Sequence, residues 1–341
     1  MIRQIIGKLL ERQDLTEQEA AGAMTQVMAG EATPAQIAAL LVGLRMKGET
    51  VDEITGFARA MRDQAVRITP RRHPLADTCG TGGDRVKTFN VSTAAAFVAA
   101  GADVAVAKHG NRSVTSKCGS ADVLEALGVS LDLEPQEVCR CIDEVGIGFM
   151  FAPRFHPAMK HAAPVRRELG MRTVFNLLGP LTNPAGATAQ LMGVPGPEWA
   201  APLAGVLAKL EVEHAFVVYG ACGVDEISIT SETCVHEVRD GQVRSYTVTP
   251  EDFGMPRAEP DSVRGGDAQV SARLLTAVLA GEPGPRRDIV ILNAAAVIAA
   301  AGKANDLTEG IAVAVESVDS GAARAKLGGL QAFCAGRQAA S

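Results

Sequence analysis

The chain has 341 residues, 47% of them hydrophobic, which is enough to bury a large core and favours two domains over one. Its formal net charge of -6 argues against a default role in binding nucleic acid, because phosphate backbones are held chiefly by clustered Lys and Arg. Seven irregularly spaced cysteines favour a reduced, cytoplasmic compartment over a disulfide framework.

Residues 1–72 are predicted to form a helical domain. Three capping boxes, each a Thr followed three residues later by Glu or Gln, mark helix starts at Thr16, Thr33 and Thr50. The first residues mix charges into a helical pattern, so we expect no export signal. No strand pattern appears before about residue 75, and the apolar faces of these helices need a partner.

Residues 73–341 are predicted to form an α/β domain, because short β-type runs alternate with helical stretches. We expect a mainly parallel central sheet flanked by helices, with strands at 74–77, 103–107, 146–151, 190–194 and 214–219. The Asp240-Gly241 turn predicts a hairpin of 234–239 with 242–248. A further strand is expected at 288–292. The longest apolar stretch, 289–302, is shorter than the roughly 20 residues that span a bilayer, so no membrane span is expected.

A glycine-rich segment, Asp77-Thr-Cys-Gly-Thr-Gly-Gly-Asp84, directly follows the first predicted strand of the sheet. Its glycines allow a ligand to approach main-chain N–H groups. Asn90-Val-Ser-Thr93 then opens a helix, whose N-terminus favours an anion. The spacing matches neither the dinucleotide-binding nor the P-loop motif. The segment predicts a phosphate site, with a plain strand-to-helix turn as the alternative.

A second polar loop, residues 108–116, follows the next predicted strand, and a helix begins near Ser120. Its cations, amide and hydroxyls suit a phosphorylated sugar, although the alternative is a solvated basic loop. Loops that follow parallel strands meet at one edge of the sheet, where open α/β sheets bind ligands. We therefore expect both loops to bind one ligand.

Three further groups of residues could bind a metal or a ligand. Asp225 and Glu226 follow a predicted strand and suit Mg²⁺, although two adjacent acids are usually a solvated turn. Arg166 lies on a helix predicted over 157–169, where an Arg normally faces water or pairs with an acid. The pair Cys139 and Cys141 lies within an amphipathic helix without a matching His or Cys pair, which favours a structural role over zinc.

Together these segments resemble the loops of anthranilate phosphoribosyltransferases that bind phosphoribosyl pyrophosphate (PRPP). The resemblance rests on Gly80-Thr-Gly-Gly-Asp84, Asn90-Val-Ser-Thr93, Lys108-His-Gly-Asn-Arg-Ser113, 166–170, 172–184 and Asp225-Glu226. It extends to Gly265-Gly-Asp267 and Arg286-Arg-Asp288 and thus covers nearly the whole chain. The family implies a fold like that of nucleoside phosphorylases, a homodimer paired through the helical domain, and part of 160–184 joining that domain. It also implies a place in tryptophan biosynthesis.

The family assigns a role to individual residues. It implies that anthranilate contacts Gly80, Asn111 and Arg166, and that Mg²⁺ is bound by Ser92, Asp225 and Glu226. The residues that it implies for PRPP are Gly80, Gly83, Asp84, Thr88, Asn90, Val91, Ser92, Thr93, Lys108, His109, Gly110, Asn111, Arg112, Ser113, Val114, Thr115, Ser116 and Ser120.

The implied reaction joins the amino group of anthranilate to the ribose of PRPP, with inversion at the anomeric carbon and release of pyrophosphate. The planar fork of an Arg matches the anthranilate carboxylate. His109 invites a role as general base, but an aromatic amine is nearly proton-free at neutral pH, so shaping of the loop is favoured.

Two other classes of protein are alternatives to this family. A pyrimidine nucleoside phosphorylase shares the implied fold, but its Lys-x-Ser-Thr-Gly-Gly loop is not found here. A non-catalytic paralogue that binds nucleic acid disagrees with the acidic balance. The chain departs from many relatives at Arg85 and Lys87, which add positive charge beside the expected pyrophosphate.

Overall fold

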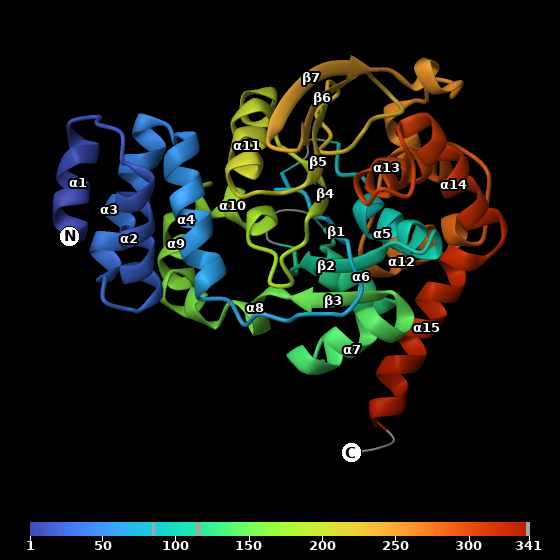
Figure 1. The fold of residues 1–341 in the computed structure, drawn as a ribbon, viewed down its shortest axis with the longest axis horizontal. Helices are drawn as coiled ribbons and strands as arrows, with labels where there is room; N and C mark the ends of the chain where they lie inside the picture. Colours follow the sequence, from blue (N-terminus) through green and yellow to red (C-terminus); the bar gives the residue numbers. More distant parts are fainter. Residues whose placement is uncertain (84–85, 114–116, 339–341) are drawn as a thin grey trace.

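The computed structural model describes residues 1–83, 86–113 and 117–338. Figure 1 shows a small group of N-terminal helices beside a larger body built around one sheet. Two hydrophobic clusters hold this arrangement together. In β5, Phe216 and Val218 point into one cluster, while Ala215 and Val217 point into the other, which the helical domain shares. Because successive side chains of a strand point to opposite faces of the sheet, β5 contributes to both clusters.

Four N-terminal helices build the small domain: α1 (Ile2–Leu10), α2 (Glu17–Met28), α3 (Pro34–Lys47) and α4 (Val51–Asp63). All three predicted capping boxes are confirmed, at Thr16, Thr33 and Thr50. Helix α1 packs on α3, and α2 packs on α4. The helices α9 (Ala163–Leu169) and α10 (Phe175–Leu178), from much later in the chain, contact α3 and α4 respectively.

The larger domain is built on a seven-stranded sheet with the order β3-β2-β1-β4-β5-β6-β7. Its strands are β1 (Leu75–Thr78), β2 (Ala105–Gly110), β3 (Ile147–Phe151), β4 (Ala189–Gly193), β5 (His214–Gly220), β6 (Thr233–Arg239) and β7 (Gln242–Val248). Strands β1 to β5 are parallel, as predicted, and β6 and β7 continue the sheet antiparallel. In the predicted hairpin, Asp240 and Gly241 both have positive φ angles (50° and 75°), as a type I′ turn requires.

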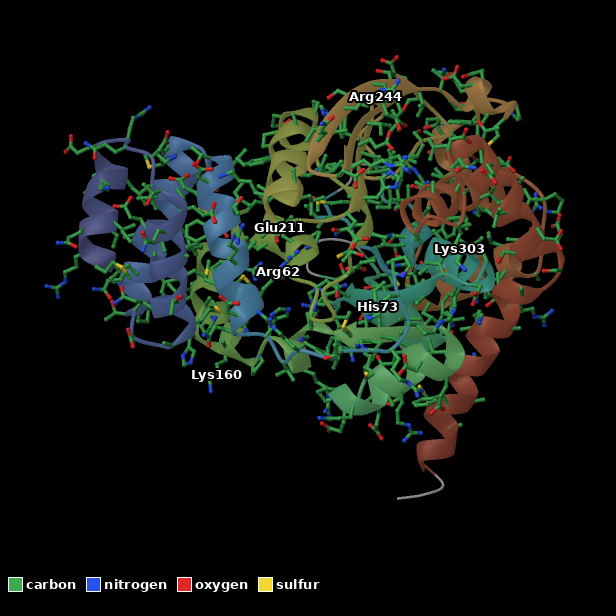
Figure 2. All side chains as sticks on the ribbon, viewed as in Figure 1. Arg62, His73, Lys160, Glu211, Arg244 and Lys303 are labelled. Carbon is green, nitrogen blue, oxygen red and sulfur yellow. The ribbon has the colours of Figure 1, made fainter. Side chains whose placement is uncertain are left out.

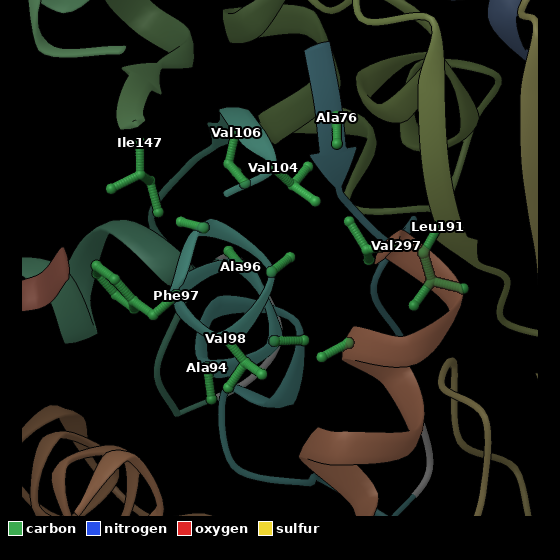
Figure 3. Close-up of a cluster of buried hydrophobic side chains, with 14 of the residues drawn as sticks. Ala76, Ala94, Ala96, Phe97, Val98, Val104, Val106, Ile147, Leu191 and Val297 are labelled. Atoms are coloured by element: carbon green, nitrogen blue, oxygen red, sulfur yellow. The ribbon is translucent and has the colours of Figure 1, made fainter. Parts of the chain in front are cut away.

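Helices enclose the sheet: α5 (Val91–Gly101), α6 (Ser120–Ala126), α7 (Pro135–Val145), α8 (Ala152–Phe155), α11 (Pro197–Lys209), α12 (Ala268–Leu279), α13 (Pro285–Ala300), α14 (Leu307–Asp319) and α15 (Ala322–Gln338). Helix α5 is central, and Figure 3 shows Phe97 and Val98 of this helix among side chains of the strands and of α13. No helix in the described part of the chain is long and apolar enough to cross a membrane.

Two predictions of local structure are wrong. Residues 288–292, predicted as a strand, belong to α13. The error arises because an apolar run that is buried on every side has the same sequence pattern in a helix as in a central strand. The helix predicted over 157–169 is divided into a 3₁₀ helix (Pro157–His161) and α9. Pro164, which has no N–H to donate, instead occupies the first turn of a new helix.

The two domains meet along α4. Arg62 Nε donates to Leu181 O at 2.7 Å, and Arg59 Nη2 donates to Lys209 O at 2.7 Å. Figure 2 shows Arg62 on the side of α4 that faces the larger domain. Burial lowers the pKa of Arg62 to about 10, which still leaves the guanidinium charged at neutral pH.

Candidate active site

The glycine-rich segment lies on the sheet edge where β1 and β4 end. Beyond the end of β1, Cys79 N donates to Leu191 O at 3.2 Å and Thr81 N donates to Gly193 O at 2.9 Å. The segment therefore follows β4 before it turns. Gly82 and Gly83 have φ angles of 65° and 95°, a region that side chains disfavour. This backbone conformation explains why glycine stands at both positions.

Asp225, the first residue of the acidic pair, lies against this glycine segment. A Cβ atom at Gly80 would lie 2.7 Å from Asp225 Oδ2, so only glycine leaves room for that carboxylate. Glu226 is buried. The loop is fixed by Asn293 of α13, whose Oδ1 accepts from Ile227 N at 2.9 Å and whose Nδ2 donates to Ile227 O at 2.9 Å. The acids are thus held in place beside the loop that follows β1.

The N-terminus of α5 completes this part of the site. Asn90 is the N-cap residue, but its side chain makes no capping hydrogen bond. Its Oδ1 atom and Thr93 Oγ1 are buried without a hydrogen-bond partner among the described residues. Ser92 is partly exposed and Val91 is buried. At the positive end of the helix dipole, the Thr93 hydroxyl can donate to a phosphate oxygen, whereas Asn90 Oδ1 can only accept, for example from a ribose hydroxyl.

Lys108 lies beneath the glycine segment, buried in β2. Its Nζ atom donates to the backbone oxygen of Thr78 and, at 2.9 Å, to Thr78 Oγ1. Asp77 is also buried, and its carboxylate accepts from His109 N at 3.1 Å and from Asn183 Nδ2 at 2.7 Å. Burial raises the pKa of Asp77 to about 6 and lowers the pKa of Lys108. These groups fix the ends of β1 and β2 relative to each other.

The loop after β2 is stabilised chiefly by α6. Arg112 pairs with Glu125 at 2.8 Å and with Asp122 at 3.1 Å, so its guanidinium is held by carboxylates of that helix. Ser113 N also donates to Asp122 Oδ2, at 3.0 Å. Ser120 Oγ donates to Asn111 O at 3.4 Å, and it leaves no room for a side chain at Gly110. In this structure the Arg112 side chain therefore shapes the loop rather than extending away from α6.

Part of the predicted PRPP site lies outside the described residues, namely Asp84, Val114, Thr115 and Ser116. Of the others, Thr88 forms an isolated antiparallel bridge with Arg264. Gly265 N donates to Lys87 O at 3.0 Å, which joins the chain after the glycine segment to the C-terminal part of the domain. A cavity of about 300 Å³ is lined by Lys87, Thr88, Lys117 and Arg264 among others, so the surroundings of this segment are basic.

Arg166, the predicted anthranilate contact, lies on α9. Its guanidinium stands 5.1 Å from the centre of the Phe175 ring, within the range of a cation–π interaction. Burial lowers the pKa of Arg166. A desolvated guanidinium of this kind binds a carboxylate more strongly than an exposed one. The segment that carries it also approaches the glycine segment, because Arg172 Nη2 donates to Gly82 O at 3.0 Å.

His109 pairs with a residue that the sequence did not single out, His156. The ring centres are 5.1 Å apart, and both Nε2 atoms are buried without a partner among the described residues. Burial lowers the pKa of His109 to about 3 and that of His156 to about 4, so both rings are neutral at pH 7. His109 Nδ1 lies 3.2 Å from Gly179 O, which favours the tautomer that is protonated at Nδ1. A ring with so low a pKa is a weak general base.

The site offers few protein ligands for a metal. Within the described ranges, no group of three or more His, Cys, Asp or Glu side chains could hold an ion. Mg²⁺, however, is usually bound through one or two carboxylates together with substrate phosphates and water. Asp225 and Glu226 beside a phosphate-type loop fit that mode of binding.

Sequence reasoning missed Asn183, Asn293, His156 and the contact of Arg172. Each acts through the fold: the two amides satisfy buried groups from distant segments, and His156 reaches His109 from beyond β3. The one signal available was a polar residue within an otherwise apolar run, as at Asn293, because a buried amide requires partners.

Comparison with known proteins agrees with this geometry. A glycosyl transferase family model for an a/b domain matches residues 72–324, and a model for the helical bundle domain of the same family matches residues 3–65. Fold and site thus define a glycosyl transferase with a helical-bundle domain and an α/β domain.

Relatives define the protein more closely. Anthranilate phosphoribosyltransferase of Symbiobacterium thermophilum is 60% identical over 332 residues, 97% of each chain. The crystal structure of the enzyme of that name from Thermus thermophilus has 49% identity and a TM-score of 0.92, covering 96% of this chain and 98% of that one. The Saccharomyces cerevisiae enzyme in complex with PRPP and Mg has 27% identity and a TM-score of 0.89, covering 98% of both chains. The chain belongs to the anthranilate phosphoribosyltransferase family.

Proposed function

We propose that this chain transfers the 5-phosphoribosyl group of PRPP to the amino group of anthranilate, giving N-(5-phosphoribosyl)anthranilate and pyrophosphate, in tryptophan biosynthesis. One observation carries the proposal: the Asp225 carboxylate lies against Gly80, which supports a single site made of the acidic pair and the glycine segment. Relatives that cover nearly the whole chain bear the name of this enzyme.

Different residues are proposed to bind PRPP, anthranilate and Mg²⁺. The glycine segment, the N-terminus of α5 and residues 108–116 with Ser120 are proposed to hold PRPP. Arg166 is proposed to hold the anthranilate carboxylate, with Gly80 and Asn111 lining the same place. Asp225, Glu226 and Ser92 are proposed to hold Mg²⁺, which neutralises charge on the pyrophosphate leaving group. The solved structure of the Saccharomyces cerevisiae enzyme in complex with PRPP and Mg supports PRPP and Mg²⁺ as the bound species.

The proposed reaction needs little acid–base help. The amine nitrogen attacks the anomeric carbon, and the bond from that carbon to the pyrophosphate oxygen breaks with inversion. The amine then loses one proton to the departing pyrophosphate or to water. A carbocation-like ribose in the transition state is stabilised by positioning and by charge. The low pKa of His109 supports a role in positioning, because this ring holds no proton at neutral pH beyond the one on Nδ1.

Loss of anthranilate fluorescence tests the proposal directly. Signal should fall only when PRPP and Mg²⁺ are both added to the pure protein, and pyrophosphate should appear in equal amount. Phosphorolysis of thymidine or uridine without anthranilate turnover would favour the nucleoside phosphorylase alternative instead. A gel-shift assay with single-stranded and duplex DNA tests the nucleic-acid-binding alternative.

We also propose a homodimer that pairs through the helical domain. Two large apolar side chains at helix ends in this domain are exposed, Leu10 at 77% and Met46 at 72%, which supports a contact there. Replacing both with Glu should shift the sedimentation coefficient to that of a monomer.

The proposed domain limits are 1–72, joined by part of 160–184, and 73–341. The contacts of α9 with α3 and of α10 with α4 support them.

A cytoplasmic location is proposed as well. The thiols of Cys79, Cys139, Cys141, Cys222 and Cys234 are free, as a reducing compartment would keep them. Fractionation of cells that express the chain tests this location.

A further inference from the structure

The Arg172 side chain reaches from the segment after α9 to the glycine segment. Its Nη2 atom donates to Gly82 O at 3.0 Å, and its guanidinium fills the space beside Gly83 so closely that a Cβ atom there would overlap Nη1. The side chain is half-buried. One arginine thus fixes the two glycines at the point where the segment turns.

The backbone that carries Arg172 is anchored at both ends in the helical domain. Val165 of α9 and Val174 after the turn are both buried in the hydrophobic cluster of that domain. Gly170 caps α9 in the left-handed conformation, and its N–H donates to Arg166 O at 3.3 Å. Thr173 N donates to Asn176 Oδ1 at 2.9 Å. Residues 166–175 therefore form a short, braced turn rather than a loose connection.

The same turn carries the proposed anthranilate contact. Arg166 stands at its beginning and stacks on Phe175 at its end, with 5.1 Å between the guanidinium carbon and the ring centre. If the glycine segment moves and displaces Arg172, residues of this turn must change conformation. Because the same few residues position Arg166, such a change also affects Arg166.

Opposing charges act on Arg172 where it lies. Burial has the largest effect and lowers its pKa, Asp225 raises the pKa, and Arg45 of α3 lowers it. The guanidinium thus lies within electrostatic range of Asp225 and of Arg45. A polyanion bound at the glycine segment would attract both Arg172 and Arg45, because each side chain carries a positive charge.

We propose that Arg172 is a positioning residue that couples the two substrates of the reaction, because a single braced turn holds both the glycine segment and Arg166. The inference rests on the proposed function. Pyrophosphate bound at the glycine segment further restrains Gly82 and Gly83, and because Arg172 contacts both glycines, it also restrains Arg172 and the turn that presents Arg166. Anthranilate then binds to an arranged site and loses less entropy on binding.

Fluorescence titration of anthranilate into the full chain measures this coupling. The titration is done with and without Mg²⁺ and inorganic pyrophosphate, which occupies the glycine segment but permits no turnover. For the unaltered chain we expect pyrophosphate to tighten anthranilate binding about tenfold, within the usual range of coupling between two sites. Arg172→Gln should reduce that ratio to about twofold or less, because it weakens anthranilate binding more in the presence of pyrophosphate than in its absence. Arg172→Lys, which keeps the charge but loses the fork, should give an intermediate ratio.

Arg167→Gln is the matched control, because Arg167 is an exposed neighbour on α9 and should leave the ratio unchanged. A purely structural role of Arg172 would lower the melting temperature and weaken both titrations equally, and that result would overturn the proposal. The proposal also fails if the ratio of Arg172→Gln equals that of the unaltered chain, or if the unaltered chain shows no coupling. Turnover of anthranilate with PRPP is measured in parallel: its absence in the unaltered chain defeats the proposed function, whereas turnover without coupling defeats only the role of Arg172.

Discussion

Replacing Arg166 with alanine should weaken anthranilate binding far more than PRPP binding. Arg166 is half-buried and burial lowers its pKa, so its contact with a carboxylate belongs to the stronger class of charge-assisted hydrogen bonds. Loss of such a contact costs roughly 1.5 to 3 kcal/mol, which corresponds to a rise of about ten- to a hundredfold in the Michaelis constant for anthranilate. An exposed ion pair would be worth about 1 kcal/mol or less.

The same substitution removes the stacking of Arg166 on Phe175, which contributes about 0.5 to 1 kcal/mol to folding at an exposed site and more at a buried one. A thermal melt therefore accompanies the kinetics. Steady-state rates are measured with each substrate varied in turn, and Arg167→Ala on the same helix serves as the matched control. If the contact is equally strong in the ground and transition states, the saturated rate stays largely intact. An unchanged anthranilate constant, or an equal loss for both substrates, would remove Arg166 from the anthranilate site.

Three further outcomes are expected. Asp225→Asn combined with Glu226→Gln should sharply reduce activity across a Mg²⁺ titration while the fold persists in circular dichroism; a full rate would reduce the pair to a structural turn. Asn293→Leu should destabilise the fold by about 2 to 4 kcal/mol in urea unfolding, because both backbone groups of Ile227 lose their buried partner. His156 has a folded pKa of about 4, below its ordinary value, so the unfolded chain takes up its proton first as the pH falls. Stability should therefore decline from about pH 6.5 to 4, and His156→Asn should remove up to about 3 kcal/mol of that decline; identical pH profiles of the free energy of unfolding would contradict this.

Much of the architecture was predictable from the chain itself. The capping boxes at Thr16, Thr33 and Thr50 predicted their helices correctly, because capping depends on residues only three positions apart. The five parallel strands and the Asp240-Gly241 hairpin followed from patterns that are also local. The strand predicted at 288–292 failed because a run buried on all sides carries no period.

The residue types at the ends of β1, β2 and β5 could be read from the chain, and their resemblance to a family indicated which chemistry they serve. The folded chain was needed to show that the Asp225 carboxylate occupies the space that a side chain at Gly80 would need, and that Arg172 rests against Gly83. It also brought together the rings of His109 and His156, with their lowered pKa values. The physical reason is the range of the forces involved. Caps and turns are set by neighbouring residues, whereas burial, close approach and the electrostatic environment of a side chain depend on segments that only the folded chain brings side by side.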